Sequence, residues 1–198
     1  YSIFGTAWRG GSGTSVATLP DDDREVFSPC AAGALYNRAA FQSGGGFDER
    51  FFCYLEDVDL GFRLRLRGAR CIQVRKAEIL HVGSAIAGSG SDFFLYHSQR
   101  NRIWTLVKNL PLPLVLLSLP LQIVVIPVTV WRRGRGKRLQ ALKGVIAGFA
   151  GLGPMLASRR QVQRERAIGT VALARMLVWS PFRALRQAPH FLSREQPG

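Results

Sequence analysis

The sequence predicts an α/β domain followed by a mostly helical, basic, membrane-associating tail. Three observations support this fold class. Short apolar runs alternate with helical patterns before residue 109, an uncharged segment follows, and the last third of the chain is strongly basic. Residues 1–130 carry 13 Lys and Arg against 11 Asp and Glu, whereas residues 131–198 carry 14 against 2. An appendage this basic favours a polyanionic partner. We therefore divide the chain into residues 1–110 and 111–198.

The first elements surround a glycine-rich loop. Residues 1–28 are rich in Gly, Ser and Thr, and Asp21–Asp23 follows a proline, so we expect loops and no metal motif there. The small apolar run Cys30–Tyr36 predicts a buried strand. A short helix then ends at Gly44–Gly46, where three glycines suit positive backbone angles or a close backbone approach.

A helix is expected to begin at Glu56 and to end at Gly68. Its first residues include three carboxylates and its last turns are rich in Arg, which suits the helix dipole at both ends. Cys71–Val74 predicts a short strand, and Ala77–Leu80 a further extended piece.

The next helix has a sequence signal for its start. We expect Asp92 to cap it and the helix to run through about Lys108. Three cysteines without paired spacing predict reduced core residues.

The segment Asn109–Trp131 contains 23 residues without a charge. That length would cross a bilayer. Three prolines interrupt it and both flanks are basic, which favours a broken helical hairpin or an in-plane interfacial helix. The apolar segment Gly144–Ala157 is too short to span a bilayer, so we expect it to lie at the membrane surface as well. We expect an anionic membrane surface as a partner and no nucleic acid, because the tail lacks a recognisable nucleic-acid fold. An arginine-rich segment is usually a solvated helical surface, but the adjoining 23 uncharged residues favour a membrane.

Several carboxylates lie beside the glycine-rich loop, and they suit glycosyl transfer. Inversion needs one carboxylate that takes the proton from an acceptor hydroxyl as its oxygen attacks the anomeric carbon. A divalent metal can neutralise the leaving diphosphate. Glu56 and Asp57 at a helix start are favoured as anions by the dipole. Taken alone, the pair would more often be simple capping residues.

The ordered motifs between Cys30 and Pro111 resemble family 2 glycosyltransferases of the rhamnosyltransferase-like type, which have the GT-A fold. They cover roughly 80 residues. The matching pieces are Ala32-Gly33-Ala34 with Arg38, Gly45-Gly46-Phe47-Asp48-Glu49, Glu56-Asp57-Val58-Asp59-Leu60, Arg63 with Gly68, His81, and Arg100-Asn101 before Lys108-Asn109-Leu110-Pro111.

The resemblance implies roles for individual residues. Asp57 would be the general base, and Glu56 would orient the acceptor or support the base. His81 would join a site for Mg²⁺ or Mn²⁺, although a histidine at the end of an apolar strand is as often structural. The residues implied to contact substrate are Gly33 and Ala34 at the pocket floor, Gly45, Gly46, Phe47 and Asp48 near the sugars, and Arg100 facing the diphosphate.

The resemblance also implies a function. We expect an inverting glycosyltransferase that moves a sugar, plausibly rhamnose, from a nucleotide-diphosphate donor to a lipid-linked or polysaccharide acceptor. Its place would be the cytoplasmic face of the cell membrane. Only 29 residues precede Cys30, so we expect the acceptor-side half of the GT-A domain alone, inactive without its nucleotide-binding half. The alternative is a non-catalytic membrane-surface scaffold that retains the half-fold.

Overall fold

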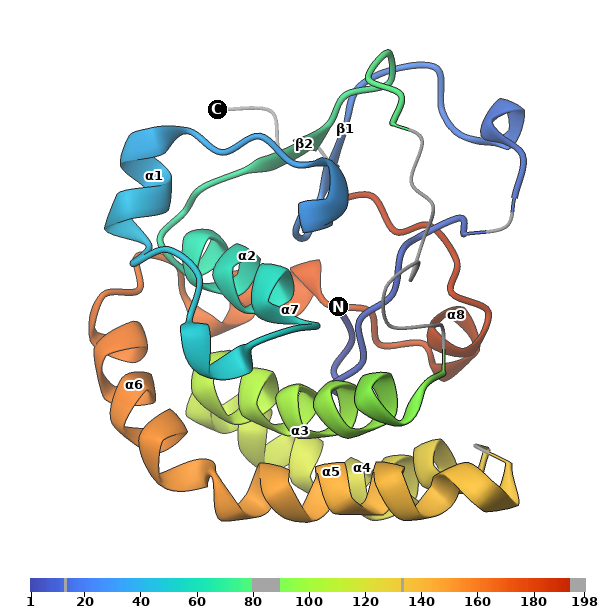
Figure 1. Ribbon diagram of the computed structural model, residues 1–198. Coiled ribbons are helices and arrows are strands. Elements are labelled where there is room, and N and C mark those ends of the chain that lie inside the picture. Colours follow the sequence, from blue (N-terminus) through green and yellow to red (C-terminus); the bar gives the residue numbers. More distant parts are fainter. Residues whose placement is uncertain (13, 80–89, 133, 193–198) are drawn as a thin grey trace.

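The computed structural model describes residues 1–12, 14–79, 90–132 and 134–192. Within them the chain is mostly helical and has one small sheet of two strands (Figure 1). The elements in chain order are η1 (Val16–Thr18), β1 (Arg24–Val26), η2 (Ala31–Gly33), α1 (Arg38–Ser43), η3 (Glu49–Phe51), α2 (Glu56–Leu66), β2 (Cys71–Gln73), α3 (Asp92–Asn109), α4 (Leu112–Trp131), η4 (Arg135–Lys137), α5 (Arg138–Ala150), α6 (Leu152–Arg164), α7 (Thr170–Met176) and α8 (Pro181–Leu185).

The sheet pairs β1 with β2 in antiparallel register, with Val26 opposite Cys71. The strand expected at Cys71–Val74 is therefore confirmed over three residues. The buried strand expected at Cys30–Tyr36 is wrong, because this segment forms η2 and then irregular chain. The Ala31 N–H donates a hydrogen bond to the Asp57 carboxylate rather than to the carbonyl of a neighbouring strand. The segment thus contributes a turn beside α2.

The predicted helices form, with a different cap for one of them. α2 spans Glu56–Leu66 and Gly68 follows it at φ 86°. α3 begins one residue after Ser91, whose hydroxyl accepts the Phe94 N–H at 3.1 Å. The cap is thus Ser91 rather than Asp92, because the residue before the first helical turn provides the cap. The cysteines are free, but Cys30 is exposed and the other two are half-buried, so the expectation of core residues is wrong.

α3 lies at the centre of the fold, between α2 and α5 (Figure 1). α5 buries small residues such as Ala141 and Gly148 against it. At Gly144 a Cβ would lie 2.3 Å from the Tyr96 carbonyl, so only glycine permits this close packing. One hydrophobic cluster joins residues from both sides of position 110, including Ile3, Phe27, Phe62, Leu106, Leu114, Leu173 and Leu177.

α4 is one continuous helix from Leu112 to Trp131, with Pro120 and Pro127 inside it. The expected helical hairpin is therefore wrong, because the helix continues past each proline although each removes one N–H donor. By length and composition α4 is long and apolar enough to cross a membrane, and only 17% of its apolar window is buried. α5 and α6, bent by 57°, pass the same test together.

Candidate active site

The glycine-rich loop is held by the side chain of Arg63 from α2. Gly45 and Gly46 have φ of 80° and 64°, as three glycines in a row predicted. The Arg63 guanidinium donates to the Gly46 carbonyl at 2.7 Å and also to the Gly44 carbonyl. This places the loop against the later turns of α2, where a Cβ on Gly44 would lie 2.9 Å from the Leu64 side chain.

Asp59 is at the centre of a buried ionic network between α2 and α3. Its carboxylate is fully buried and accepts from Arg63 Nε at 2.9 Å, Lys108 Nζ at 2.8 Å and Asn109 Nδ2 at 2.8 Å. Lys108 Nζ also donates to Asp48 Oδ2 at 2.7 Å. The one ammonium therefore ties the glycine-rich loop to α2.

Asp48 is held as an anion by this network. Burial favours a higher pKa, but hydrogen bonds from Arg50 and Lys108 outweigh burial and hold the pKa of Asp48 well below its usual range. A single oxygen of Asp48, Oδ2, accepts hydrogen bonds from both Arg50 and Lys108.

Sequence reasoning did not assign roles to Asp59, Lys108 or Asn109. One local signal was available: Asp59 and Arg63 are four residues apart on a helix, the spacing of an ion pair on one face. The contacts with α3 had no such signal, because they join residues about 50 positions apart.

Glu56 and Asp57 begin α2 and are both half-buried. Asp57 Oδ2 accepts the Ala31 N–H at 3.0 Å, and its Oδ1 accepts the Val58 N–H at 2.8 Å, so this carboxylate is fixed in orientation. Glu56 differs, because its Oε2 is buried and has no hydrogen-bond partner among the described residues. Burial raises the pKa of Glu56, its own backbone N–H opposes that rise, and the neighbouring Asp57 charge adds to it.

A cleft of about 350 Å³ opens at this point. It is lined by Ala31, Phe47, Asp48, Glu49, Phe52 and Glu56. Three residues predicted to contact substrate or to assist catalysis thus share one cleft: Phe47, Asp48 and Glu56. Gly33 is placed differently, since a Cβ on it would lie 2.5 Å from the Ile79 side chain. Ala34 follows η2 and is half-buried.

Arg100 contacts protein groups in the structure. Its Nη2 donates to the Phe51 carbonyl at 2.8 Å and to the Arg50 carbonyl at 3.1 Å, and its guanidinium lies 4.3 Å from the centre of the Trp104 ring. Burial lowers the pKa of Arg100. The role expected for it at a diphosphate stays a prediction.

His81 lies outside the described residues, so its expected place in a metal site stays a prediction. Among the described residues, no group of three His, Cys, Asp or Glu side chains could hold a metal ion. The residues described here therefore do not form a site for the implied Mg²⁺ or Mn²⁺.

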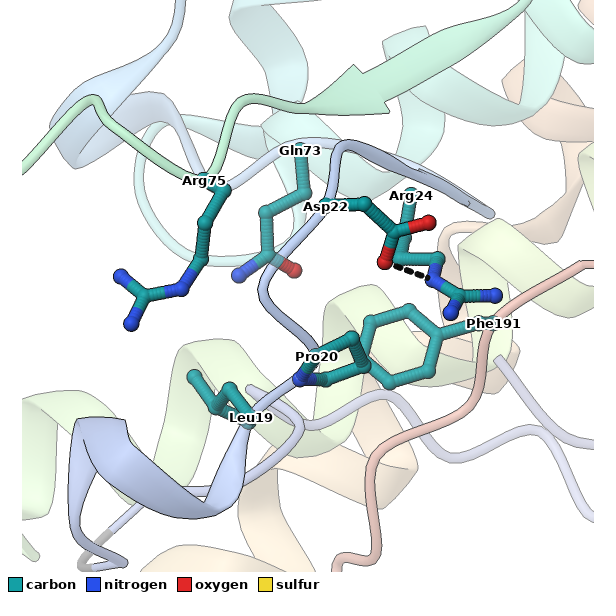
Figure 2. A pocket seen from close by; sticks show the side chains of 7 residues that line it. All are labelled: Leu19, Pro20, Asp22, Arg24, Gln73, Arg75 and Phe191. Carbon is teal, nitrogen blue, oxygen red and sulfur yellow. Dashed lines mark hydrogen bonds and ion pairs between the residues drawn. The ribbon is translucent and has the colours of Figure 1, made fainter.

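The Asp21–Asp23 loop borders a second, much smaller cavity. Asp22 pairs with Arg24 at 2.6 Å. Figure 2 shows this pair next to Phe191, with Arg75 on the other side of Gln73. Arg75 also pairs with Asp21 at 3.6 Å. The cavity measures about 10 Å³, close to the minimum for one water molecule, so it does not admit a sugar nucleotide.

Curated proteins provide an independent comparison. Over 157 residues the chain is 30% identical to the N-acetylglucosaminyl-diphospho-decaprenol L-rhamnosyltransferase of Mycobacterium tuberculosis, in strain H37Rv and in strain CDC 1551, covering 73% of this chain and 50% of the relative. Over 62 residues it is 39% identical to the O-antigen biosynthesis protein RfbC of Myxococcus xanthus, covering 31% of this chain and 5% of that protein.

The other comparisons are negative. No protein-family model matches the chain. No solved structure matches it. The chain spans about half the length of the rhamnosyltransferases it matches. The similarity to these named proteins supports a glycosyltransferase family for this chain.

Proposed function

We propose that this chain is the acceptor-side half of an inverting glycosyltransferase with a GT-A fold. The sugar, plausibly rhamnose, comes from a nucleotide-diphosphate donor and goes to a lipid-linked or polysaccharide acceptor. The relatives named rhamnosyltransferase, both of them named for a decaprenol-linked acceptor, support this choice. The observation that carries it is the cleft of about 350 Å³ that Glu56 lines, next to Asp57 at the start of α2.

The proposed step assigns Asp57 as the base. Its carboxylate is oriented by the N–H groups of Ala31 and Val58, and each oxygen retains a lone pair that can accept a proton. Asp57 takes the proton of an acceptor hydroxyl while that oxygen bonds to the anomeric carbon of the donor sugar. The bond from that carbon to the diphosphate breaks on the opposite face, and the nucleoside diphosphate leaves with the electron pair.

Glu56 orients the acceptor in this proposal. Its side chain is half-buried and lines a cleft of a size that suits a small ligand, and its Oε2 is buried without a hydrogen-bond partner among the described residues. A hydroxyl donated to the Glu56 carboxylate would align the attacking atom.

The proposal includes a divalent ion and a membrane. Mg²⁺ or Mn²⁺ would supply charge for the leaving diphosphate. The exposed apolar side chains of α4 and the net charge of +12 over residues 131–198 support attachment to an anionic surface, at the cytoplasmic face of the cell membrane.

The test is sugar transfer by the complete gene product, with Asp57→Asn and Glu56→Gln compared with the unchanged protein. Asp57→Asn keeps the shape and removes the base, so we expect turnover to fall at least 100-fold, the lower end of a general base's contribution, with donor binding retained. Glu56→Gln should mainly raise the KM for acceptor. Full turnover by Asp57→Asn would refute the assignment of the base.

A further inference from the structure

Phe52 presents an exposed aromatic ring from a strained backbone. Its side chain is 74% exposed, yet its φ and ψ are 62° and −62°, a conformation that a residue with a Cβ rarely adopts. Tyr54 and Leu55 also have positive φ, at 67° and 65°. Three such residues within four positions, none of them glycine, require support from the surrounding structure. Strain of this kind is typical of functional sites.

The support comes from two side chains of α3, of which one is fully buried and one half-buried. The Asn101 amide, fully buried, donates to the carbonyls of Phe51, Cys53 and Tyr54 at 2.9, 2.9 and 2.7 Å. Arg100 Nη2 also donates to the Phe51 carbonyl at 2.8 Å. Side chains of α3 therefore hold the backbone of residues 51–54 in this conformation.

The Phe52 ring is also positioned by its neighbours. It lies 6.1 Å from the Phe93 ring and 5.8 Å from the His97 ring, measured between centroids. Phe93 and His97 are 4.4 Å apart and form one backing surface. Because the ring still lines the cleft, it offers a fixed apolar platform there.

The rest of the cleft complements a sugar ring. A second phenyl ring, from Phe47, and the carboxylates of Glu49 and Glu56 line the same space. A pyranose has an apolar face of C–H groups and an edge of hydroxyl donors. The rings suit its face, and the carboxylate of Glu56, which lines the cleft, suits a hydroxyl. An apolar ligand would offer no donor to the half-buried Glu56 carboxylate.

We infer that the cleft holds a pyranose ring of the acceptor, stacked on Phe52 and donating a hydroxyl to Glu56. This inference rests on the proposed function and specifies the acceptor class for the same site. It makes Phe52 a residue that determines acceptor affinity rather than donor affinity.

The test compares Phe52→Gly with Phe52→Tyr in the complete gene product. Glycine adopts φ of 62° freely, so Phe52→Gly relaxes the backbone while it removes the ring and its contacts with Phe93 and His97. Tyrosine keeps the ring. The matched control is Phe182→Ala on α8, where the ring is 72% exposed and lies outside the cleft. Folding is checked by thermal unfolding; backbone relaxation and the loss of the ring contacts oppose each other, so the midpoint of Phe52→Gly should stay close to that of the unchanged protein.

Two measurements separate the inference from the proposed function. The first is the KM for a short-chain N-acetylglucosaminyl-diphospho-prenol and for nucleotide-diphosphate rhamnose. The second is saturation transfer in NMR from the protein to the ring hydrogens of methyl N-acetylglucosaminide, which needs no turnover. For Phe52→Gly we expect about a tenfold rise in acceptor KM, equivalent to about 1.4 kcal/mol, with donor KM within about twofold. Saturation transfer should weaken in parallel, while Phe52→Tyr and Phe182→Ala stay close to the unchanged protein.

The outcomes are distinct. Transfer activity with an acceptor KM that Phe52→Gly leaves unchanged overturns the inference and leaves the proposed function standing. An equal rise in acceptor and donor KM also overturns it. Saturation transfer that depends on Phe52, without any sugar transfer by the unchanged protein, supports the sugar site and overturns the proposed function.

Discussion

Replacing Lys108 with Met tests whether the buried network holds α2, α3 and the glycine-rich loop together. The Lys108 ammonium lies 2.7 Å from Asp48 and 2.8 Å from Asp59, and its side chain is 3% exposed. Removing one partner of a buried ion pair costs about 3–5 kcal/mol, because the other charge stays buried. Asp59 keeps Arg63, and Asp48 keeps Arg50, so we expect the lower end, about 3 kcal/mol.

The assay is urea unfolding at neutral pH, followed by circular dichroism, with a thermal scan beside it. For a chain of this length, a loss of about 3 kcal/mol lowers the midpoint by about 6–12 °C. The matched control is Lys143→Met on α5, where the lysine is exposed and the change should stay within about 0.5 kcal/mol. A loss below about 1 kcal/mol for Lys108→Met would refute the assigned role of the network.

Three further predictions concern carboxylates and the membrane. The pKa of Asp48 is lower in the folded state than its unfolded value of 3.8, so the stabilisation that its charge provides is present above pH 3.8 and is lost as pH falls. In acid, the urea midpoint of Asp48→Asn should therefore decline less than that of the unchanged protein. Parallel declines of the two midpoints would contradict this. The pKa of Glu56 is raised in the folded state, so ionisation of Glu56 lowers the free energy of unfolding as pH rises. Glu56→Gln should have a higher urea midpoint than the unchanged protein at about pH 8 and lose that advantage at about pH 4. The absence of a difference at either pH would argue against burial as the cause of the raised pKa. Ile123 on α4 is 75% exposed, and Ile123→Asp should reduce flotation of the protein with anionic vesicles more than the control Val171→Asp on α7. Equal flotation of the two variants would exclude α4 as the surface that contacts the membrane.

The local elements were predictable from the sequence for local reasons. The start of α2 at Glu56 follows from its acidic first turn, and its end follows from Gly68. The positive angles at Gly45 and Gly46 follow from the side chains that these residues lack. The strand expected at Cys30–Tyr36 failed because a short apolar run does not specify whether a partner strand exists.

The sequence by itself thus determined the helices of the first half, the apolar length of α4 and the carboxylate pair that begins α2. Only the tertiary structure decided which carboxylate is buried in ion pairs and which faces a cleft. Asp59 and Glu56 lie three residues apart, yet one contacts Lys108 and Asn109 from α3 and the other has an unpartnered oxygen. The physical reason is that burial and pairing depend on contacts between segments distant along the chain, about which neighbouring residues carry no information.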